Sequence, residues 1–452
     1  MIVSDTYQGK TIAVFGLART GVAVVEALVA GGAIVLAWDD NAECCDQVAS
    51  VAVDLYAADF SDVDYFVVAP GVPLTHPKPH KLVLKAQAAG VPVIGDFDLF
   101  AWAQPSLPPH KTVAITGTNG KSTTTALIHH MISSCGKNSV MAGNIGTGLM
   151  SLDALPSGGV YVLEMSSYQI DLTHDFRPDV TVLINVSPDH LDRHGDMAGY
   201  VAAKTRLFEM QETGSAVISI DDEYGQEVAA HCTQDVVTIS VNKRLESGVY
   251  VSNGLLFEAD SCETVLMGSV ADVPTLKGQH NWQNAAAAFA VGRVLGLKIE
   301  DMIASFKSFP GLAHRQERIT EISGVTYIND SKATNVDAAA RALASFTNIH
   351  WIAGGRMKED NIQALMPYMH HIKKAYLIGE AAAMMFESLP EDVDCSLSDT
   401  LENAVAQASA NASPGDVILM SPACAAFDQF LHFEARGDEF RKLVLDLAEK
   451  AA

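Results

Sequence analysis

The sequence has few basic residues, and the charge balance excludes one class of partner. Its 452 residues include 30 lysines and arginines against 54 aspartates and glutamates, which gives a formal net charge of −24. Proteins that bind phosphate backbones normally carry a basic patch, so this balance argues against nucleic acid as a partner. We interpret the excess of acid as a solvated surface.

Patterned cysteines and long apolar runs are also missing. The seven cysteines are scattered and include no Cys-x-x-Cys pair, which argues against a disulfide framework and a cysteine zinc site. No apolar run reaches the roughly 18 residues that a membrane span needs, and residues 1–10 do not resemble a signal peptide. We therefore expect a soluble, unexported, cytoplasmic protein with no membrane span.

The chain does have the length and the apolar content for several domains. It is too long for one ordinary core, which favours two or three domains, and 48% of its residues are hydrophobic. Short apolar runs alternate with helical stretches, a pattern typical of parallel sheets built from strand–helix–strand units. The predicted strands form three series: residues 11–15, 34–38, 65–68 and 91–95; then 112–116, 160–164, 180–185 and 216–220; then 325–328, 350–353, 375–378 and 417–420.

Breaks and turns separate these series. The proline-rich stretch 104–110 reads as a linker between the first and second series. A hairpin is predicted over residues 249–257, turning on Asn253-Gly254, because this dipeptide suits a two-residue turn. An alanine-rich helix is predicted over 281–295, and Phe309-Pro310-Gly311 then ends the second series.

A phosphate-binding loop is predicted where the first strand of the second series ends. It reads Thr116-Gly117-Thr118-Asn119-Gly120-Lys121-Ser122-Thr123. Glycines let backbone N–H groups face phosphates, the following helix N-terminus adds positive potential, and Lys121 would neutralise phosphate oxygens. Ile115 stands where the strict motif has its first glycine, but the strand before and the helix after favour nucleotide binding over an ordinary turn.

Two further candidates follow neighbouring predicted strands, where ligands of open parallel sheets bind. Glu164 ends an apolar strand and offers the oxygen ligands that magnesium needs, with a helix N-cap or a surface acid as the alternatives. His190 lies in Ser187-Pro188-Asp189-His190, and a hydrogen-bonded loop histidine is the better interpretation of that residue alone, because imidazole is a softer ligand than magnesium usually takes.

Lys204 interrupts an apolar stripe on a helix predicted over residues 197–210. Such a lysine usually reaches water with its ammonium group. The alternative is a desolvated amine whose neutral form can react with carbon dioxide to give a carbamate, an extra oxygen ligand for a metal.

In this order, the phosphate loop, Glu164, the loop around His190 and Lys204 resemble the Mur ligase family of ATP-dependent amino-acid ligases, over essentially the whole chain. The resemblance implies that Glu164 and His190 hold Mg²⁺ or Mn²⁺ and that carbamylated Lys204 supports a second metal. The implied catalytic residues are Lys121, Glu164, His190 and Lys204, and the implied metal ligands are Ser122, Thr123, Glu164, His190 and Lys204 as its carbamate.

Other segments resemble family motifs in the same order. Residues 143–146 resemble the loop that meets the γ-phosphate and the substrate, 278–281 the start of the adenine-side helix, 311–315 the hinge into the last domain, and 329–335 the ribose and acceptor loop. The implied ATP-binding residues are Gly117, Thr118, Asn119, Gly120, Lys121, Ser122, Thr123, Asn281, Asn284, Arg315, Asp330 and Lys332.

The two ends of the chain carry the implied substrate sites. Residues 16–21 resemble the glycine-rich motif of dinucleotide-binding proteins, but Ala18 stands in place of its middle glycine. The segment also resembles a uracil-nucleotide site of the family. The implied UDP-substrate residues are Arg19, Thr20, Asp39, Asp40, Gly71, Asn144 and His190. Near the C-terminus, 421–430 resembles an acceptor signature, and the implied acceptor residues are Lys358, Thr334, Ala426, Phe427 and Phe433.

Two departures from the family pattern are visible, and a simpler interpretation of the C-terminal segment stays open. Ala426 stands where a serine is common, and Ala313 where the hinge usually has proline. The alternative interpretation of residues 421–430 is a buried strand-to-helix turn in which Cys424 packs in the core.

The resemblance implies an α/β protein with three domains. These are a Rossmann-like UDP-substrate-binding domain over 1–103, a central ATP-binding domain of the P-loop mononucleotide type over 104–311, and a Rossmann-like acceptor domain over 312–452. The implied activity is the addition of D-glutamate to UDP-N-acetylmuramoyl-L-alanine through an acyl phosphate, with release of ADP and phosphate, in peptidoglycan precursor synthesis. We expect a monomer.

Three other functions remain open at this point. A sister ligase of the family would add a different amino acid. A nicotinamide-dependent oxidoreductase would account for residues 16–21 and Asp39 but leave the phosphate loop and Glu164 without a purpose. A non-catalytic nucleotide-binding regulator would bind ATP yet release no phosphate.

Overall fold

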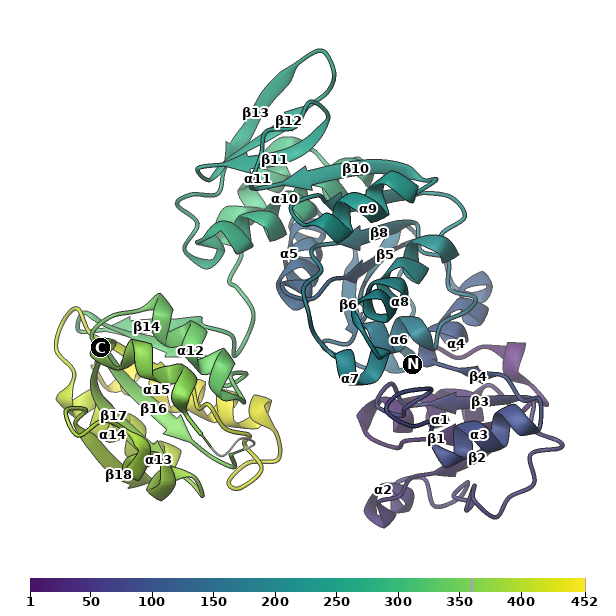
Figure 1. Cartoon of the computed structure of the whole chain (residues 1–452), viewed down its shortest axis with the longest axis horizontal. Helices are drawn as coiled ribbons and strands as arrows, with labels where there is room; N and C mark the ends of the chain where they lie inside the picture. The colour runs from purple at the N-terminus through teal and green to yellow at the C-terminus, as the bar shows by residue number, and fades with distance from the viewer. Residues whose placement is uncertain (358–360, 452) are drawn as a thin grey trace. The chain divides into compact units, whose positions relative to one another are not determined.

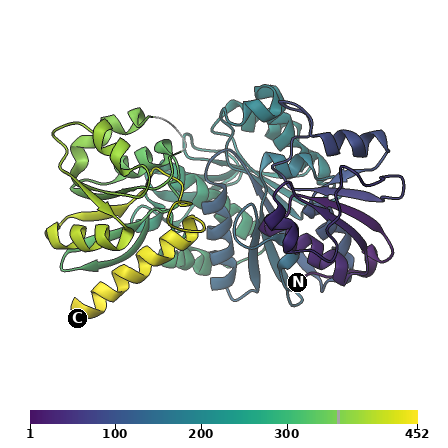
Figure 2. The same cartoon turned by 90° about the horizontal axis from the view of Figure 1, so that it is seen from below.

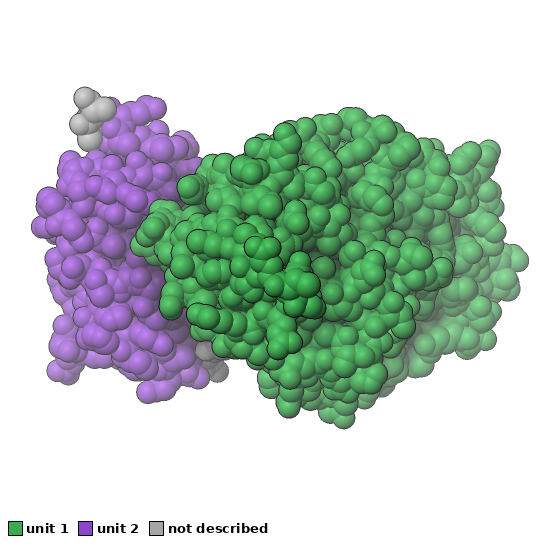
Figure 3. All heavy atoms as spheres, turned by 90° about the horizontal axis from the view of Figure 1, so that it is seen from above, with its two compact units in different colours: residues 1–309 green, residues 310–452 purple. Residues whose placement is uncertain are grey.

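The computed structural model describes residues 1–357 and 361–451, and within them the side chains of all residues except Arg19, Asp337 and Ala451. The chain forms two compact units, Met1–Phe309 and Pro310–Ala452 (Figure 3). Both units combine helices with largely parallel sheets, so the predicted α/β class is confirmed. The three predicted domain boundaries stay a prediction.

The first unit begins with a parallel sheet of order β2-β1-β3-β4 (Figure 1). Its strand β1 is buried on both faces: Ile12 and Val14 pack in the core on one side of the sheet, and Ala13 and Phe15 in the core on the other. The strands are β1 Thr11–Phe15, β2 Ile34–Trp38, β3 Tyr65–Val68 and β4 Val93–Ile94, and the helices η1 Asp5–Tyr7, α1 Arg19–Ala30, α2 Ala42–Asp46, α3 Lys81–Ala88, α4 Asp96–Ala103 and η2 Gln104–Ser106.

A second sheet in the same unit has the order β13-β12-β11-β10-β9-β8-β5-β7-β6. It is parallel from β11 to β6 and antiparallel from β11 to β13. The strands are β5 His110–Thr116, β6 Ser139–Gly143, β7 Gly159–Glu164, β8 Val180–Leu183, β9 Ser215–Ser219, β10 Asp235–Ser240, β11 Gly248–Ser252, β12 Leu255–Ala259 and β13 Thr264–Ser269.

Helices between these strands carry much of the core. The alanine-rich helix α10 packs against α5, and its residues 285–291 are fully buried, because alanine lets two helices approach closely. The helices are α5 Lys121–Ser134, η3 Leu149–Ser151, α6 Ser167–Asp171, α7 Leu191–His194, α8 Met197–Met210, α9 Glu223–His231, η4 Pro274–Leu276, α10 Gln279–Val294 and α11 Ile299–Ser308.

The predicted hairpin is confirmed as the pair β11–β12. Its turn residues Asn253 and Gly254 have φ angles of 51° and 75°. Both central residues of a type I′ turn need positive φ, which explains why asparagine and glycine occupy them.

The second unit is built on one mixed sheet of order β14-β15-β19-β16-β17-β18. Among the strand pairs that the described residues form in this sheet, only β14–β15 is antiparallel. The elements are β14 Glu317–Ile322, β15 Val325–Asn329, α12 Val336–Ser345, β16 Ile349–Gly354, η5 Gln363–His371, β17 Ile372–Ile378, α13 Ala382–Ser388, β18 Cys395–Asp399, α14 Leu401–Asn411, β19 Val417–Met420 and α15 Phe433–Ala451. Figure 2 shows α15 as the long yellow helix at the C-terminus.

Among the described residues, none of the helices combines the length and the apolar character that crossing a bilayer requires.

Candidate functional site

The predicted phosphate loop connects β5 to α5, and two glycines give it its shape. Gly117 and Gly120 have φ angles of 152° and 85°, values that L side chains rarely adopt. A Cβ atom on Gly120 would lie 2.4 Å from Oδ1 of Asn284 on α10. The loop and Asn284, predicted from separate motifs to bind ATP, therefore lie in contact.

A network of amide side chains holds the loop from the neighbouring strand ends. The backbone N–H of Asn119 donates to Oδ1 of Asn185 (2.9 Å), and Nδ2 of Asn185 donates to the Asn119 carbonyl (3.1 Å) and to Oε1 of Gln283 (3.0 Å). Gln283 in turn donates to Oγ of Ser219 and to Asp221. Sequence reasoning missed Asn185 and Gln283, because a single amide in a loop or a helix gives no motif.

Two lysines converge on the loop carbonyls. Nζ of Lys121 donates to the carbonyls of Gly117 and Thr118, both at 2.9 Å. Nζ of Lys204 on α8 donates to the same Gly117 carbonyl at 2.8 Å. Two amines, one from the start of α5 and one from α8, therefore contact the phosphate loop.

Lys204 is buried rather than extended to water. Only 2% of the residue is exposed, and its Nζ lies 4.5 Å from the centre of the Tyr200 ring. Burial lowers the pKa of the Lys204 amine well below its usual value, and the nearby Lys121 charge lowers it further. The interpretation in which the Lys204 ammonium group reaches water is therefore wrong. The structure shows a desolvated amine, which is the state that carbamate formation requires.

Glu164 is a buried carboxylate with one oxygen left unsatisfied. It ends β7 with 1% of the residue exposed, and its Oε1 accepts a hydrogen bond from Nδ2 of Asn144 (2.9 Å). Its Oε2 has no partner among the described residues. Ser166 provides the N-cap of the helix that follows, so both alternative interpretations of Glu164, the cap and the surface acid, are wrong.

His190 lies on an exposed loop just before α7. Its φ of 52° is left-handed, its Nε2 lies 3.5 Å from a carboxylate oxygen of Asp189, and its ring centre is 5.0 Å from that of Tyr168. Tyr168 lies on α6, the helix that follows Glu164, so His190 contacts the segment just after β7.

A divalent cation fits the donors present. An unpartnered buried carboxylate oxygen is costly, and a hard cation would satisfy it. No group of three or more histidine, cysteine, aspartate or glutamate side chains in residues 1–357 and 361–451 is arranged to hold a metal. Glu164 would therefore need ligands of other kinds, such as the predicted Ser122 and Thr123 hydroxyls, a Lys204 carbamate or substrate phosphates.

Five of the predicted UDP-substrate residues, Arg19, Thr20, Asp39, Asp40 and Gly71, follow the ends of β1, β2 and β3, whereas Asn144 follows β6 and His190 precedes α7. Asp39 accepts hydrogen bonds from the backbone N–H groups of Leu17 (2.6 Å) and Asn41 (2.8 Å), which fixes the turn between β1 and α1. Asp40 accepts from the Tyr56 hydroxyl (2.9 Å). Thr20 lies in the first turn of α1, and the Arg19 side chain lies outside the described residues.

The predicted residues of the second unit gather at the carboxyl ends of β15 and β19. Asp330 is buried and accepts from Oγ of Ser421 (2.7 Å) and from the Gln316 backbone N–H (3.0 Å). Burial raises the pKa of Asp330 to about 7. Arg315 lies close enough to oppose that rise, and Nζ of Lys332 lies 5.7 Å from the Phe433 ring centre.

The acceptor candidates of this unit differ in exposure. Ala426 is buried and Phe427 is 62% exposed. Thr334 is half-buried in the loop before α12, and Lys358 lies outside the described residues. Cys424 is buried in the core, as the alternative interpretation expected.

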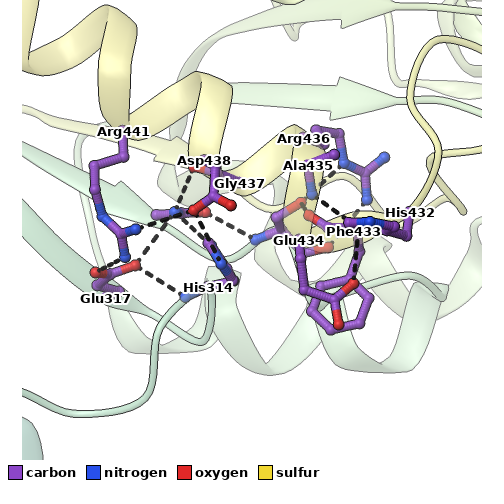
Figure 4. A network of polar contacts seen from close by, with 12 residues as sticks. His314, Glu317, His432, Phe433, Glu434, Ala435, Arg436, Gly437, Asp438 and Arg441 are labelled. Atoms are coloured by element: carbon purple, nitrogen blue, oxygen red, sulfur yellow. Dashed lines mark hydrogen bonds and ion pairs between the residues drawn. The ribbon is translucent and has the colours of Figure 1, made fainter. Parts of the chain in front are cut away.

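The start of α15 is fastened to this edge by a buried arginine. Nε of Arg436 donates to Oγ of Ser331, and its Nη2 donates to the Ser331 and Cys424 carbonyls, all at 3.0 Å. Figure 4 shows the same helix start beside His314, whose ring meets Asn329 (3.1 Å) and leaves no room for a side chain on Gly437. The predicted hinge, acceptor signature and ribose loop thus form one polar cluster within the second unit.

Comparisons with known proteins place the chain in a family. Residues 115–292 match the Mur ligase middle domain, and residues 314–424 match the family model described as Mur ligase, glutamate ligase domain. UDP-N-acetylmuramoylalanine–D-glutamate ligase of Caulobacter vibrioides (strain NA1000 / CB15N) is 48% identical over 458 residues, covering 98% of this chain and 97% of that protein. The chain belongs to the Mur ligase family. The predicted family and the prediction of a ligase are confirmed.

Other Mur ligases give the same result at two levels of similarity. The protein of the same name from Brucella abortus (strain 2308) is 46% identical over 459 residues, covering 99% of this chain and 98% of that protein. The solved UDP-N-acetylmuramate-alanine ligase from Thermotoga maritima is 16% identical with a TM-score of 0.57, covering 97% of this chain and 99% of that one. The second likeness shows that the fold is shared.

Proposed function

We propose that the chain joins D-glutamate to UDP-N-acetylmuramoyl-L-alanine and consumes ATP in doing so. The observation that carries the proposal is the sequence identity of 46–48% over nearly the whole chain to relatives named for this reaction. It is supported by a phosphate loop, two converging lysines and a buried carboxylate within one unit.

A free carboxylate resists attack by an amine, so the alanyl carboxylate must first be activated. ATP would transfer its γ-phosphoryl group to that carboxylate, giving an acyl phosphate and ADP. The D-glutamate amine, once deprotonated, would then attack the carbonyl carbon and release phosphate. The protein has to position the two oxygens in line and stabilise the charge on the phosphoryl group.

The chain's own residues suit these tasks. The backbone N–H groups in the first turn of α5 would bind the phosphates, because those of Thr118 and Asn119 already donate to Asn185, and Lys121 would exchange its carbonyl contacts for phosphate oxygens. Asn144 orients Glu164 through its 2.9 Å hydrogen bond. A bound Mg²⁺ would supply charge stabilisation for phosphoryl transfer, with Glu164, His190, the Ser122 and Thr123 hydroxyls and carbamylated Lys204 as its proposed protein ligands.

In the second unit we propose that Arg315, Asp330 and Lys332 contact the nucleotide, and that Thr334, Lys358, Ala426, Phe427 and Phe433 bind the acceptor. The raised pKa of Asp330 means that a neighbouring positive or hydrogen-bonding group would stabilise its charged form. A bound nucleotide provides hydroxyl donors of this kind.

The test is phosphate release by the purified chain with ATP, Mg²⁺ and UDP-N-acetylmuramoyl-L-alanine. D-Glutamate should stimulate release by at least about 100-fold over L-glutamate, L-alanine or a diamino acid, because a polar site rejects a substrate that leaves its groups unpaired. A sister ligase would prefer another of these acceptors. A nucleotide-binding regulator would release no phosphate with any of them.

A further inference from the structure

The short helix α7 connects two parts of the first unit that the reaction must bring together. Its residue Arg193 reaches the loop that follows β3, and its residue His194 reaches α6, the helix that follows Glu164. His190 directly precedes it as the N-cap residue. The contacts of α7 therefore determine where His190 is held.

Arg193 grips three successive carbonyls of the loop after β3. Its Nη1 donates to the Gly71 carbonyl (2.9 Å), and its Nη2 donates to those of Pro70 (3.4 Å) and Val72 (3.2 Å). A guanidinium group is a planar fork with five donors, so it can serve several acceptors at once. These charge-assisted hydrogen bonds fix the orientation of the loop's peptide planes.

That orientation leaves a donor for a ligand. In a planar trans peptide the C=O and N–H groups point in opposite directions, so the Pro70 carbonyl that faces Arg193 turns the Gly71 N–H away from it. Val72 N–H closes the turn on the Ala69 carbonyl (2.9 Å), and the Gly71 N–H has no acceptor among the described residues. Gly71 is exposed, and a Cβ atom there would meet nothing within 4 Å.

The flat face of the Arg193 guanidinium group packs on α6, the helix that follows Glu164. Its carbon Cζ lies 4.4 Å from the centre of the Tyr168 ring on α6, the distance of a cation–π contact. The His194 ring stacks on that of Tyr168 and lies tilted beside that of Tyr200, with ring centres 5.6 and 5.4 Å away.

The His194 ring contacts α6 through both ring nitrogens, and the contact at Nε2 is a hydrogen bond. Nε2 lies 2.9 Å from Oγ of Ser167, and Nδ1 lies 3.4 Å from a carboxylate oxygen of Asp171. The side chain of His194 is 4% exposed, and burial lowers its pKa to about 4. A neutral histidine, hydrogen-bonded to Ser167, therefore connects the end of α7 to α6.

We propose that Arg193 is a positioning residue that couples the loop Ala69–Val72 to His190, so that binding of a nucleoside diphosphate at the loop and alignment of the reacting carboxylate depend on one side chain. The inference rests on the proposed function for the reaction step. Arg193 itself touches backbone and an aromatic ring, which distinguishes it from a residue that binds substrate directly.

The experiment compares Arg193→Ala and Arg193→Lys with a matched control, Arg177→Ala. Arg177 also donates to backbone carbonyls, those of His174 (2.7 Å) and Phe176 (3.4 Å), but it lies away from the loop. Calorimetry of the purified full chain would measure the binding of UDP alone and, separately, of a non-hydrolysable ATP analogue. Urea midpoints would show that each variant is folded.

We expect Arg193→Ala to weaken UDP binding by roughly tenfold or more, which corresponds to the loss of about one charge-assisted hydrogen bond in the ordering of the loop. Binding of the ATP analogue should stay within about twofold. Arg193→Lys should be intermediate, because an ammonium group cannot span three carbonyls in the same plane. In turnover, KM for the UDP substrate should rise and kcat should fall, while KM for ATP stays constant.

Three results would overturn the proposal. These are unchanged UDP binding in Arg193→Ala, an equal loss of UDP and ATP-analogue binding, or an equal loss in Arg177→Ala. Since UDP binding is measured without turnover, a chain that bound UDP through Arg193 but added no D-glutamate would contradict the proposed function and leave in place the role of Arg193 in ordering the loop Ala69–Val72.

Discussion

Replacing Gly120 by alanine should damage the phosphate loop in two ways that can be separated. The φ of 85° makes any L residue strained there, at a cost of about 1–2 kcal/mol. The new Cβ would also lie 2.4 Å from Oδ1 of Asn284, so that side chain must move. It would then lose the buried hydrogen bond from Oγ1 of Thr124 (3.1 Å), worth about 1 kcal/mol. The expected loss of unfolding free energy is about 2–3 kcal/mol.

A matched control lies just beyond the other end of the same helix. Gly136 has a φ of 78°, and a Cβ atom there would meet nothing within 4 Å. Gly136→Ala should therefore carry only the backbone strain, about 1–2 kcal/mol, and leave ATP binding unchanged. Urea unfolding and calorimetry with an ATP analogue measure both effects. The reasoning would be refuted if the two variants were equally destabilised, or if Gly120→Ala bound the analogue as tightly as the wild type.

Three buried ionisable groups give further predictions. Glu164→Gln keeps an acceptor for Asn144 but loses the charge, so phosphate release should fall by about 100-fold with little change in the urea midpoint, and wild-type turnover would contradict the metal assignment. Asp330→Asn should remove a loss of stability that the wild type shows as pH rises through about 7, because a carboxyl group with a raised pKa stabilises the fold only while it is protonated. Thermal unfolding at pH 5 and pH 8 measures this loss, and an equal loss in the two proteins would be contrary evidence. Lys204→Met should unfold at a higher urea concentration than the wild type at pH 7, since a lysine with a lowered pKa costs stability as pH falls. The difference between the two urea midpoints should close toward pH 10.5. Activity should be lost, and an active variant would exclude the carbamate.

Much of the fold could be predicted because buried parallel strands and amphipathic helices have strong sequence patterns. The predicted bounds of β1, β2, β3 and α8 agree with the structure. The strands β6, β10, β13, β14 and β18 were missed. Edge strands such as β6, β13 and β18 are half-exposed and do not show the continuous apolar run that marks a central strand.

The candidate site was predictable where a residue type is chemically unusual in its context. Glu164 at the end of an apolar strand and Lys204 on an apolar helix face are both buried, Lys204 as the alternative interpretation expected rather than with its ammonium group in water. The residues that hold the phosphate loop and the loop after β3 were not predictable, because Asn185 and Arg193 act through backbone groups of distant segments. Every residue type has a backbone carbonyl that can accept a hydrogen bond, so the sequence of the accepting segment carries no pattern that would reveal the contact.

The most direct test of the account follows oxygen from the substrate to the product. UDP-N-acetylmuramoyl-L-alanine labelled with ¹⁸O in both carboxylate oxygens is incubated with the chain, ATP, Mg²⁺ and D-glutamate, and the released phosphate is analysed by mass spectrometry. If the carboxylate attacks the γ-phosphoryl group and the amine then displaces phosphate, each phosphate carries one ¹⁸O atom. Phosphate without label would show that ATP is cleaved by water rather than by the substrate, which would contradict the central claim.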